Sequence, residues 1–286
     1  MQLSVITPVY NSERFIESCL RSVVEQNCPS VEHLIMDGGS TDRTMEIVKS
    51  YAERHPHIRW VSEKDKGQSD AMNKGLRLAR GTLLGFLNAD DFYEPGALAT
   101  ALEIFQSLPD PSILIGNCNV IDGEGELLWL NRPDTKYYQL LQVWRFKMPN
   151  NPSSYFYHRS LHEKIGDFEV DDHYTMDYDF LLKAFRAAHV VYVDKTLGNY
   201  RMYADNKTSQ VFTTNAGWEM LSRLSERHVA GDSLLYRLHV RLGVALLRAN
   251  LENSGGSFAG RAQRKLMTMG QKVLDGVMAQ AERSGG

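Results

Sequence analysis

The chain has 286 residues, of which 43% are hydrophobic and 23% charged, so it can bury the core of one large domain with an appendage or of two small domains. Its formal net charge of -3 and isoelectric point near 6.3 argue against nucleic acid as a partner. Three cysteines without a C-x-x-C spacing favour neither a disulfide framework nor a zinc site, and a reducing cytosol is the expected compartment.

Apolar runs and helical stripes alternate through the first half of the chain. Strands are predicted near residues 3–7, 32–36, 58–62, 83–87 and 112–116, and helices near 13–26, 42–54, 69–80 and 96–107. Strands that alternate with helices are joined by right-handed crossovers. The expected fold class is therefore α/β, with a Rossmann-like, mostly parallel sheet and flanking helices.

Polar, turn-forming residues follow three of these strands. The segments are Thr7-Pro8-Val9-Tyr10-Asn11, Asp37-Gly38-Gly39-Ser40-Thr41-Asp42 and Asn88-Ala89-Asp90-Asp91. In an open α/β sheet, ligands bind outside the carboxyl ends of the strands. Two adjacent carboxylates at such an end can hold a hard cation, Mg²⁺ or Mn²⁺, and the cation can bind a diphosphate.

In order and spacing, these segments resemble the motifs T-P-x-Y-N, D-x-G-S-T-D-x-T and D-x-D of the family two glycosyltransferases of GT-A fold. The resemblance extends over roughly residues 1–210 and is to inverting enzymes of the bacterial surface-polysaccharide type. It implies a donor-binding half over about residues 1–110 and an acceptor-binding half over about 111–210. Residues 211–286 are expected to form a helical C-terminal region.

The resemblance assigns the first two segments to the nucleobase and ribose of a nucleotide-sugar. The candidate donor-binding residues there are Thr7, Pro8, Tyr10, Asp37 and Gly38. For Asp37 we favour ligand contact over helix capping, whereas for Asp42 we favour capping. Gly38 stands where many relatives carry a second aspartate, so the contact that this aspartate makes with the base in relatives is not expected here.

The polar segment 62–75 links a predicted strand to a helix and resembles a subgroup signature, S-E-x-D-K-G-x-x-D-A-M-N-K-G. Asp65 is a candidate acceptor for hydrogen bonds from the nucleoside hydroxyls or the base. Lys66 is a candidate counter-charge for the phosphates, and Asn73 is assigned to the same donor site. A solvated loop is the alternative.

The segment after the fourth predicted strand corresponds to D-x-D-D in many relatives, with Asn88 in place of the first carboxylate. Asp90 is the expected primary metal ligand and Asp91 the second, because adjacent carboxylates at a strand end repel each other unless a cation binds. Asn88 and Ala89 are assigned to the donor site, where an amide can bond to ribose. Capping is the alternative for Asp91.

Asp177 begins a predicted helix with an apolar stripe and resembles the aspartate of the family's acidic E-D motif, with Met176 in place of the glutamate. An inverting transfer needs a carboxylate within reach of the incoming hydroxyl. A helix N-terminus keeps such a group ionised. Asp177 is therefore the candidate general base, and helix capping is the alternative.

The segment 199–208 resembles a late family motif, R-x-H-x-x-S-x-T. Arg201 and Lys207 are candidate clamps for the phosphates. Tyr203 stands where relatives often place a histidine that joins the metal or the diphosphate, so a third protein ligand for the metal is in doubt. An exposed basic loop is the alternative reading of this segment.

The C-terminal region includes Leu234, Leu238 and Leu242 at helical spacing, with Arg237 and Arg241 beside them. Such a helix can lie on a membrane surface. The alternative is that the leucine face of this helix packs on the catalytic domain or in a homodimer. The chain shows no leader and no apolar run of the ~18 residues that span a bilayer, so we expect a cytoplasmic protein, acting at the cytoplasmic face of the inner membrane if it docks there.

The expected function is metal-dependent, inverting transfer of a hexosyl or N-acetylhexosaminyl group, with Mn²⁺ or Mg²⁺ as cofactor and a UDP-sugar as donor. The expected acceptor is a hydroxyl of a saccharide or a polyprenyl-diphosphate-linked saccharide in surface glycan synthesis. A Rossmann oxidoreductase is disfavoured because no G-x-G-x-x-G follows a strand. A catalytically silent sugar-nucleotide-binding partner subunit is the alternative, and the joint presence of Asp37 and Asp177 favours an enzyme.

Overall fold

The computed structural model describes residues 2–143, 147–172, 174–204, 206 and 215–252. They divide into two compact units, one within residues 1–136 and 147–210 and the other within 137–146 and 211–286. The segment that begins at Tyr137 thus clusters with the C-terminal helices, which the sequence did not indicate.

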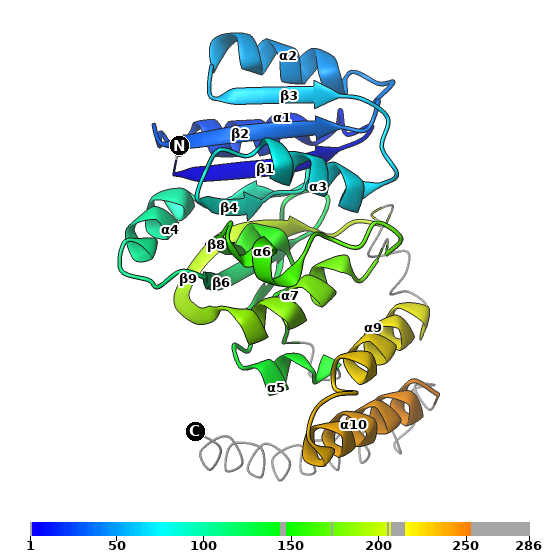
Figure 1. Cartoon of the computed structure of the whole chain (residues 1–286). Helices are drawn as coiled ribbons and strands as arrows, with labels where there is room; N and C mark the ends of the chain where they lie inside the picture. The colour runs from blue at the N-terminus through cyan, green and yellow to red at the C-terminus, as the bar shows by residue number, and fades with distance from the viewer. Residues whose placement is uncertain (1, 144–146, 173, 205, 207–214, 253–286) are drawn as a thin grey trace. The chain divides into compact units, whose positions relative to one another are not determined.

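Among the described residues, the first unit contains a nine-stranded sheet with the order β3-β2-β1-β4-β8-β6-β9-β5, and β7 pairs with β6 off this path (Figure 1). The strands are β1 (Leu3–Val9), β2 (Val31–Asp37), β3 (Ile58–Ser62), β4 (Leu83–Phe86), β5 (Phe92–Tyr93), β6 (Ser112–Ile121), β7 (Leu127–Asn131), β8 (Tyr155–His158) and β9 (His189–Arg201). The predicted strands are confirmed, with bounds that differ by a few residues.

The pairing changes along this sheet. Strands β1 to β4 pair in parallel with one another, so their carboxyl ends lie along one edge. Strand β8 runs antiparallel to both β4 and β6, and β6 pairs in parallel with β9. Strands β6 and β7 form a hairpin, and in its turn Asp122 N–H donates to Glu126 O over 2.9 Å.

Helices cover the two faces of the parallel part of the sheet. The helices of this unit are α1 (Ile16–Val24), α2 (Thr44–Arg54), α3 (Gln68–Leu78), α4 (Ala97–Phe105), α6 (Leu161–Ile165) and α7 (Met176–Ala187), with a 3₁₀ turn η2 (Pro152–Ser154). Apolar side chains of α1, α2 and α4 share one core cluster with β1 and β2. Burial on both faces explains why these strands are almost continuously apolar.

Helix α3 packs closely on β1 and β2 because its packing face includes a glycine. A Cβ atom on Gly75 would collide with Ile6 Cγ2 and would lie 3.1 Å from Met36 Cγ. The absent side chain lets the helix backbone approach the sheet. This close packing fixes the start of α3 beside the carboxyl ends of the strands, where the candidate site lies.

The second unit consists, in its described part, of α5 (Tyr137–Leu140), α9 (Asn215–His228) and α10 (Leu234–Glu252). Arg248 bridges α10 to Glu219 of α9 over 2.8 Å. Leu234, Leu238 and Leu242 are 62%, 54% and 50% exposed, so the predicted apolar stripe of α10 is present on its surface. No helix within the described ranges is long and apolar enough to cross a membrane. Residues 253–286 lie outside those ranges.

Candidate active site

The turns after β1 and β2 are bound to each other. Gly38 N–H donates to Val9 O over 2.9 Å. Asn11 accepts a hydrogen bond from Thr41 N–H through its side-chain oxygen, and its own N–H donates to Ser40 Oγ, each over 2.8 Å. The first two motifs of the sequence therefore form one surface at the carboxyl edge of the sheet.

Asp37 holds this surface together. Its carboxylate accepts hydrogen bonds from the N–H groups of Gly39 and Ser40 and from the hydroxyls of Ser40 and Ser62. The Ser62 bond, 2.6 Å long, also ties β2 to the end of β3. Asp37 is 2% exposed, so its contact with a ligand stays a prediction, while its contact with its own turn is observed. Asp42 accepts from Thr44 N–H at the start of α2, as a capping residue would.

The three residues nominated in the first motif lie in different environments. Thr7 is fully buried, and its hydroxyl bonds to His33 Nε2 over 2.9 Å inside the sheet layer. Tyr10 is 62% exposed, so its ring is accessible beside the strand ends. Pro8 is partly buried between them. Of the three, the Tyr10 side chain is the one free to contact a ligand, whereas the Thr7 hydroxyl serves the core.

The loop between β3 and α3 brings Asp65 to the same surface. Asp65 Oδ1 accepts from Gly67 N–H over 2.8 Å, and Asp65 Oδ2 lies 2.6 Å from the point where a Cβ atom on Gly38 would be. Lys66 is exposed. Asn73 is 4% exposed and uses both ends of its amide on the main chain of Phe168, so it anchors the loop before α7.

Asp91 points into the fold. It is fully buried, and its carboxylate accepts from Asn88 Nδ2 over 3.0 Å, Asn151 Nδ2 over 2.7 Å and Arg201 N–H over 2.9 Å. Burial, followed by the charge of Asp90, raises the pKa of Asp91 well above its usual range. Asp91 thus connects the turn after β4 to η2 and to β9, and both of its oxygens are engaged within the protein.

Asp90 has a different environment. Its Oδ2 accepts from Tyr203 Oη over 3.1 Å, and its main-chain oxygen accepts from Arg201 Nε. Burial raises the pKa of Asp90, and Tyr203 and Arg201 oppose that rise. No group of three or more His, Cys, Asp or Glu residues that could hold a metal occurs in the part of the chain that the structure describes.

Arg201 is a buried, stacked cation. It is 9% exposed, and its guanidinium lies 4.8 Å from the ring centroid of Phe15 and 5.5 Å from that of Phe92. The exposed-loop reading therefore does not hold for Arg201 itself. Lys207, the other predicted phosphate clamp, lies outside the described residues.

Helix α3 links the Asn88 turn to the start of α7. Gln68 Nε2 donates to Asn88 Oδ1 over 3.0 Å. The next residue, Ser69, contacts Met176 Sδ through its hydroxyl. Asp177 follows Met176 directly, so the first turn of α3 contacts both the candidate metal-binding turn and the residue that precedes the candidate base.

Asp177 is half-buried and lies near the aromatic face of β8. Burial raises the pKa of Tyr155 and of Tyr157 well above the usual range, and the next cause for both is the charge of Asp177. The N-cap residue of α7, Thr175, makes no side-chain capping bond. The turn before α7 is instead held by Asp172, which accepts from Tyr174 N–H, Thr175 N–H and the Thr175 hydroxyl.

Asp172 was missed by the sequence analysis, although the pattern D-x-x-T before a helix was available as a signal. Because Asp172 holds the turn, Asp177 is not needed as the cap of α7. The capping alternative for Asp177 is therefore weakened.

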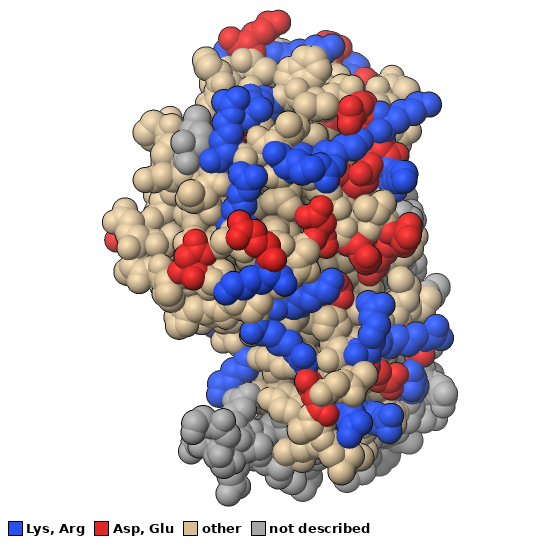
Figure 2. Space-filling model, viewed as in Figure 1, with Lys and Arg blue, Asp and Glu red and all other residues tan. Residues whose placement is uncertain are grey.

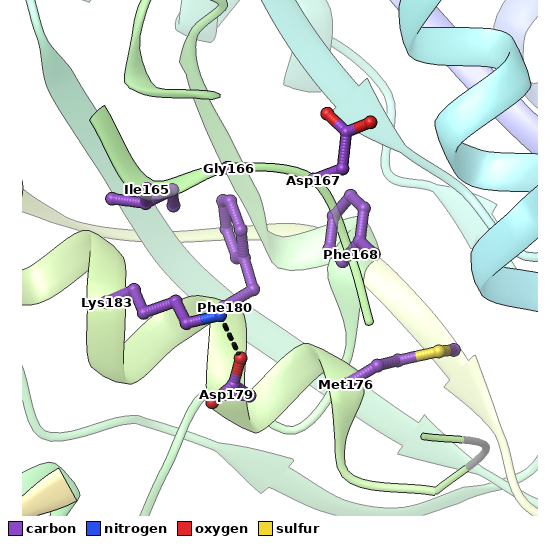
Figure 3. A pocket seen from close by; sticks show the side chains of 8 residues that line it. All are labelled: Ile165, Gly166, Asp167, Phe168, Met176, Asp179, Phe180 and Lys183. Carbon is purple, nitrogen blue, oxygen red and sulfur yellow. Dashed lines mark ion pairs between the residues drawn. The ribbon is translucent and has the colours of Figure 1, made fainter. Parts of the chain in front are cut away.

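Figure 3 shows a small pocket beside α7. Its lining residues are Ile165, Gly166, Asp167, Phe168, Met176, Asp179, Phe180 and Lys183. Asp179 and Lys183 form a 2.6 Å ion pair on its wall, with the Asp179 side chain 7% exposed. The Asp179 carboxylate is thus paired with Lys183.

On the face of the molecule drawn in Figure 2, acidic and basic side chains are interspersed, without a single-sign patch of the kind that binds nucleic acid.

Comparison with known proteins gives a coherent result. The family model described as "Glycosyl transferase family 2" matches residues 4–166. A PGL/p-HBAD biosynthesis glycosyltransferase of Mycobacterium bovis is 30% identical over 249 residues, which are 86% of this chain and 89% of that protein. Chondroitin synthase of Escherichia coli is 29% identical over 209 residues, which are 71% of this chain, and the chain spans 29% of its length.

Two solved structures share the fold. The structure of S. aureus TarS 1–349 in complex with UDP-GlcNAc has a TM-score of 0.66 at 21% identity, covering 92% of this chain and 78% of TarS 1–349. The mannosyltransferase PcManGT from Pyrobaculum calidifontis, in complex with GDP-Man and Mn²⁺, has a TM-score of 0.54 at 20% identity, covering 95% and 80%. The expected α/β, GT-A type of fold is confirmed, and the chain belongs to glycosyl transferase family 2 and is a glycosyltransferase.

Proposed function

We propose that this glycosyltransferase transfers a sugar from a UDP-sugar to a hydroxyl of a saccharide acceptor, with inversion at the anomeric carbon. The observation that supports the proposal is a chain of contacts from Asn88 through α3 to Met176, the residue before Asp177. An inverting transfer needs a leaving-group site and a base around one sugar.

The donor is proposed to lie on the carboxyl ends of β1, β2 and β4. The exposed ring of Tyr10 offers a face for the base, and Gly38 lies at the same strand ends with the Asp65 carboxylate beside it. Lys66 is exposed at the start of α3, where free N–H groups and a positive dipole favour phosphate. UDP-GlcNAc in TarS and GDP-Man in PcManGT support a nucleoside diphosphate sugar as the donor class.

Asp90 is the proposed protein ligand for Mn²⁺ or Mg²⁺. Its Oδ2 already accepts from Tyr203, and a carboxylate oxygen at a strand end is the hard donor that these ions prefer. Phosphate oxygens and water would complete the coordination. A bound cation would stabilise negative charge on the departing diphosphate. We leave Asp91 out of this site because both its oxygens accept hydrogen bonds inside the fold.

Asp177 is the proposed general base. It lies in the first turn of α7, where the helix dipole favours the ionised carboxylate. It would accept the proton of the acceptor hydroxyl as the new bond to carbon forms. Arg201, held by stacking near the Asp90 turn, is proposed to add positive charge beside the phosphates.

We propose a lipid-linked saccharide as the acceptor, with transfer at the cytoplasmic face of the inner membrane. The exposed leucine stripe of α10, with Arg241 exposed within it, has the composition of a helix that can lie on a membrane. A homodimer built on the same stripe is the competing use. Liposome flotation against size-exclusion chromatography separates the two, because docking needs lipid and dimerisation does not.

One experiment tests the donor nucleotide, the dependence on metal and the stereochemistry of the transfer. The purified chain is incubated with UDP-, GDP- and dTDP-sugars in Mn²⁺, in Mg²⁺ and in EDTA, while thermal stability and diphosphate release are followed. We expect UDP-sugars to stabilise the protein in a metal-dependent way, and NMR of the product to show an inverted anomeric centre. Retention of configuration would contradict the mechanism. Donor binding without any transfer to polyprenyl-linked or free saccharides would instead favour a silent partner subunit.

A further inference from the structure

We infer that β7 is an interaction surface for a second copy of this chain, and that two copies pair through it as antiparallel edge strands about a two-fold axis. The inference concerns assembly, so it goes beyond the proposed reaction and does not rest on it. The surface consists of residues of the first unit, whereas the leucine stripe of α10 belongs to the second.

Strand β7 exposes an uninterrupted run of large apolar side chains. Leu127, Leu128, Trp129 and Leu130 are 60%, 45%, 46% and 36% exposed. Neighbouring side chains of a strand point to opposite faces, so four consecutive residues expose apolar groups on both faces. Single exposed leucines are ordinary on a protein surface, whereas a contiguous apolar patch marks an interaction site.

The main chain of β7 has an open side. Within the described part of the chain, β7 pairs with β6 alone, in an antiparallel register that sets Trp129 opposite Val120. Its outward N–H and C=O groups are therefore a template on which another strand can pair. Soluble proteins commonly block such an edge with charged residues or proline, and residues 127–131 contain neither. A register shift between Val120 and Ile121 lies at the turn end of the hairpin, so the rest of the edge keeps regular pairing.

The charges at the two ends of β7 favour another copy of the same strand. Glu126 precedes the apolar run and Arg132 follows it, and both are exposed. In an antiparallel pair centred on Trp129, Glu126 of each copy lies opposite Arg132 of the other, because the two residues are equally far from the centre. A two-fold contact is self-complementary, and opposite charges on neighbouring strands stabilise their pairing. Arg132 remains accessible, since its 3.8 Å ion pair with Asp194 leaves the two side chains 65% and 68% exposed.

The same charges argue against a membrane as the partner of this strand. The turn before β7 carries Asp122, Glu124 and Glu126, which an anionic lipid surface would repel. Segments that dock on membranes flank their apolar residues with Lys and Arg instead. A second copy of the chain fits both the apolar run and the charges.

The hairpin that carries β7 contacts the candidate active site. Ile121 of β6 pairs with Arg201 of β9, and Gly123 O in the turn accepts from Arg201 Nη1 over 3.4 Å. A Cβ atom on Gly123 would lie 3.6 Å from Tyr203 Cβ. The inferred interface is thus adjacent to the side chains that hold Asp90, and pairing would restrain the hairpin beside them.

The test measures the dissociation constant of the dimer of the full chain, by sedimentation velocity over a series of protein concentrations without lipid. The variants are Trp129→Glu, which puts two like charges at the centre of the pair, Glu126→Arg, and the swapped variant Glu126→Arg/Arg132→Glu. Leu238→Glu in the stripe of α10 is the matched control. All these side chains are exposed, so the fold is expected to survive, and circular dichroism checks it.

We expect the wild-type chain to form a dimer and Leu238→Glu to match it. Trp129→Glu should weaken the dimer by at least about thirtyfold, the loss typical of a central aromatic residue in an interface. Glu126→Arg should weaken it by about fivefold, because the new arginine faces Arg132 of the other copy at both ends of the pair. The swapped variant should return to within about twofold of wild type, since each ion pair is rebuilt with its charges exchanged.

Other results would overturn the inference. A wild-type chain that remains monomeric at every concentration would exclude the pair. A dimer that Leu238→Glu dissociates and Trp129→Glu does not would assign the interface to α10. A monomer that floats with anionic liposomes, and loses that binding in Trp129→Glu, would assign β7 to a membrane. A swapped variant that stays as weak as Glu126→Arg would reject the antiparallel register, also if Trp129→Glu does not fold.

Discussion

Tyr203 donates a hydrogen bond from its phenol to Asp90 Oδ2 across 3.1 Å, joining the segment after β9 to the turn after β4. The Tyr203 ring lies 5.1 Å from the ring of Phe15, on which Arg14 also stacks. Burial, followed by the charge of Asp90, raises the pKa of Tyr203, so the phenol stays protonated and keeps donating. A neutral phenol is a poor metal ligand, and we conclude that Tyr203 orients Asp90.

Replacing Tyr203 with phenylalanine tests this role. The variant keeps the aromatic stack and removes only the donor to Asp90, so Mn²⁺-dependent UDP binding should weaken by about tenfold, as for other residues that orient a metal ligand. Calorimetric titration of UDP with Mn²⁺ and with EDTA measures the effect. Tyr192→Phe is the matched control, because that phenol donates to Asn117 at the other end of β9. An unchanged dependence on Mn²⁺ in Tyr203→Phe would show that Asp90 does not need the phenol.

Asp177→Asn should separate binding from turnover. The amide cannot take the acceptor proton, so kcat should fall by about 10² to 10⁴ while UDP affinity stays within about twofold of wild type. A coupled assay for UDP release and a direct binding titration give the two quantities. Asp167→Asn is the matched control, since that side chain is 54% exposed in the loop before α7. Near-normal turnover of Asp177→Asn would remove Asp177 from the reaction.

Asp91→Asn should destabilise the fold. An amide nitrogen in place of either Asp91 oxygen would face a donor, Asn151 Nδ2 on one side or Arg201 N–H on the other. A buried donor left without an acceptor should lower the free energy of unfolding by about 2 kcal/mol, measured by urea titration. Asp90→Asn should leave that free energy nearly unchanged and abolish metal-linked donor binding. If Asp91→Asn has wild-type stability but no longer binds Mn²⁺, then Asp91 is a metal ligand after all.

His33 should make the fold sensitive to acid. It is fully buried, and burial, followed by the charge of His57, lowers its pKa from 6.5 to about 3. The unfolded chain takes up a proton below pH 6.5, while the folded chain excludes it until about pH 3, so stability is complete above 6.5 and declines as the pH falls toward 3. Between pH 7 and pH 5 the titration of His33 should lower the free energy of unfolding by about 2 kcal/mol.

Urea unfolding of wild type and of His33→Gln at the two pH values measures the His33 contribution. Glutamine can still bond to the Thr7 hydroxyl but does not titrate in this range. Other groups also respond to acid, His57 among them, because partial burial lowers its pKa too. The decisive quantity is therefore the loss of unfolding free energy between pH 7 and pH 5 in wild type minus the same loss in His33→Gln. Equal losses of stability in both would mean that His33 does not control the acid response.

The sequence located the strand ends well but could not assign what each side chain does there. Thr7, Asn73 and Asp91 were nominated because they lie in motifs, yet the structure turns their polar groups toward His33, Phe168 and Asn151. A shift of one residue along a strand or turn exchanges the buried face for the exposed one. Motif membership therefore does not distinguish a ligand contact from a buried hydrogen bond.

The amino-acid sequence by itself determined the alternation of strands and helices, the placement of polar residues after β1, β2 and β4, and the start of a helix at Asp177, because these depend on local periodicity and turn chemistry. Only the tertiary structure decided that Asp65 fills the space beside Gly38, that Tyr203 orients Asp90 and that Ser69 contacts Met176. Each of these contacts joins residues from different elements. Their distances are set by how the helices pack on the sheet, and no short stretch of sequence contains that information.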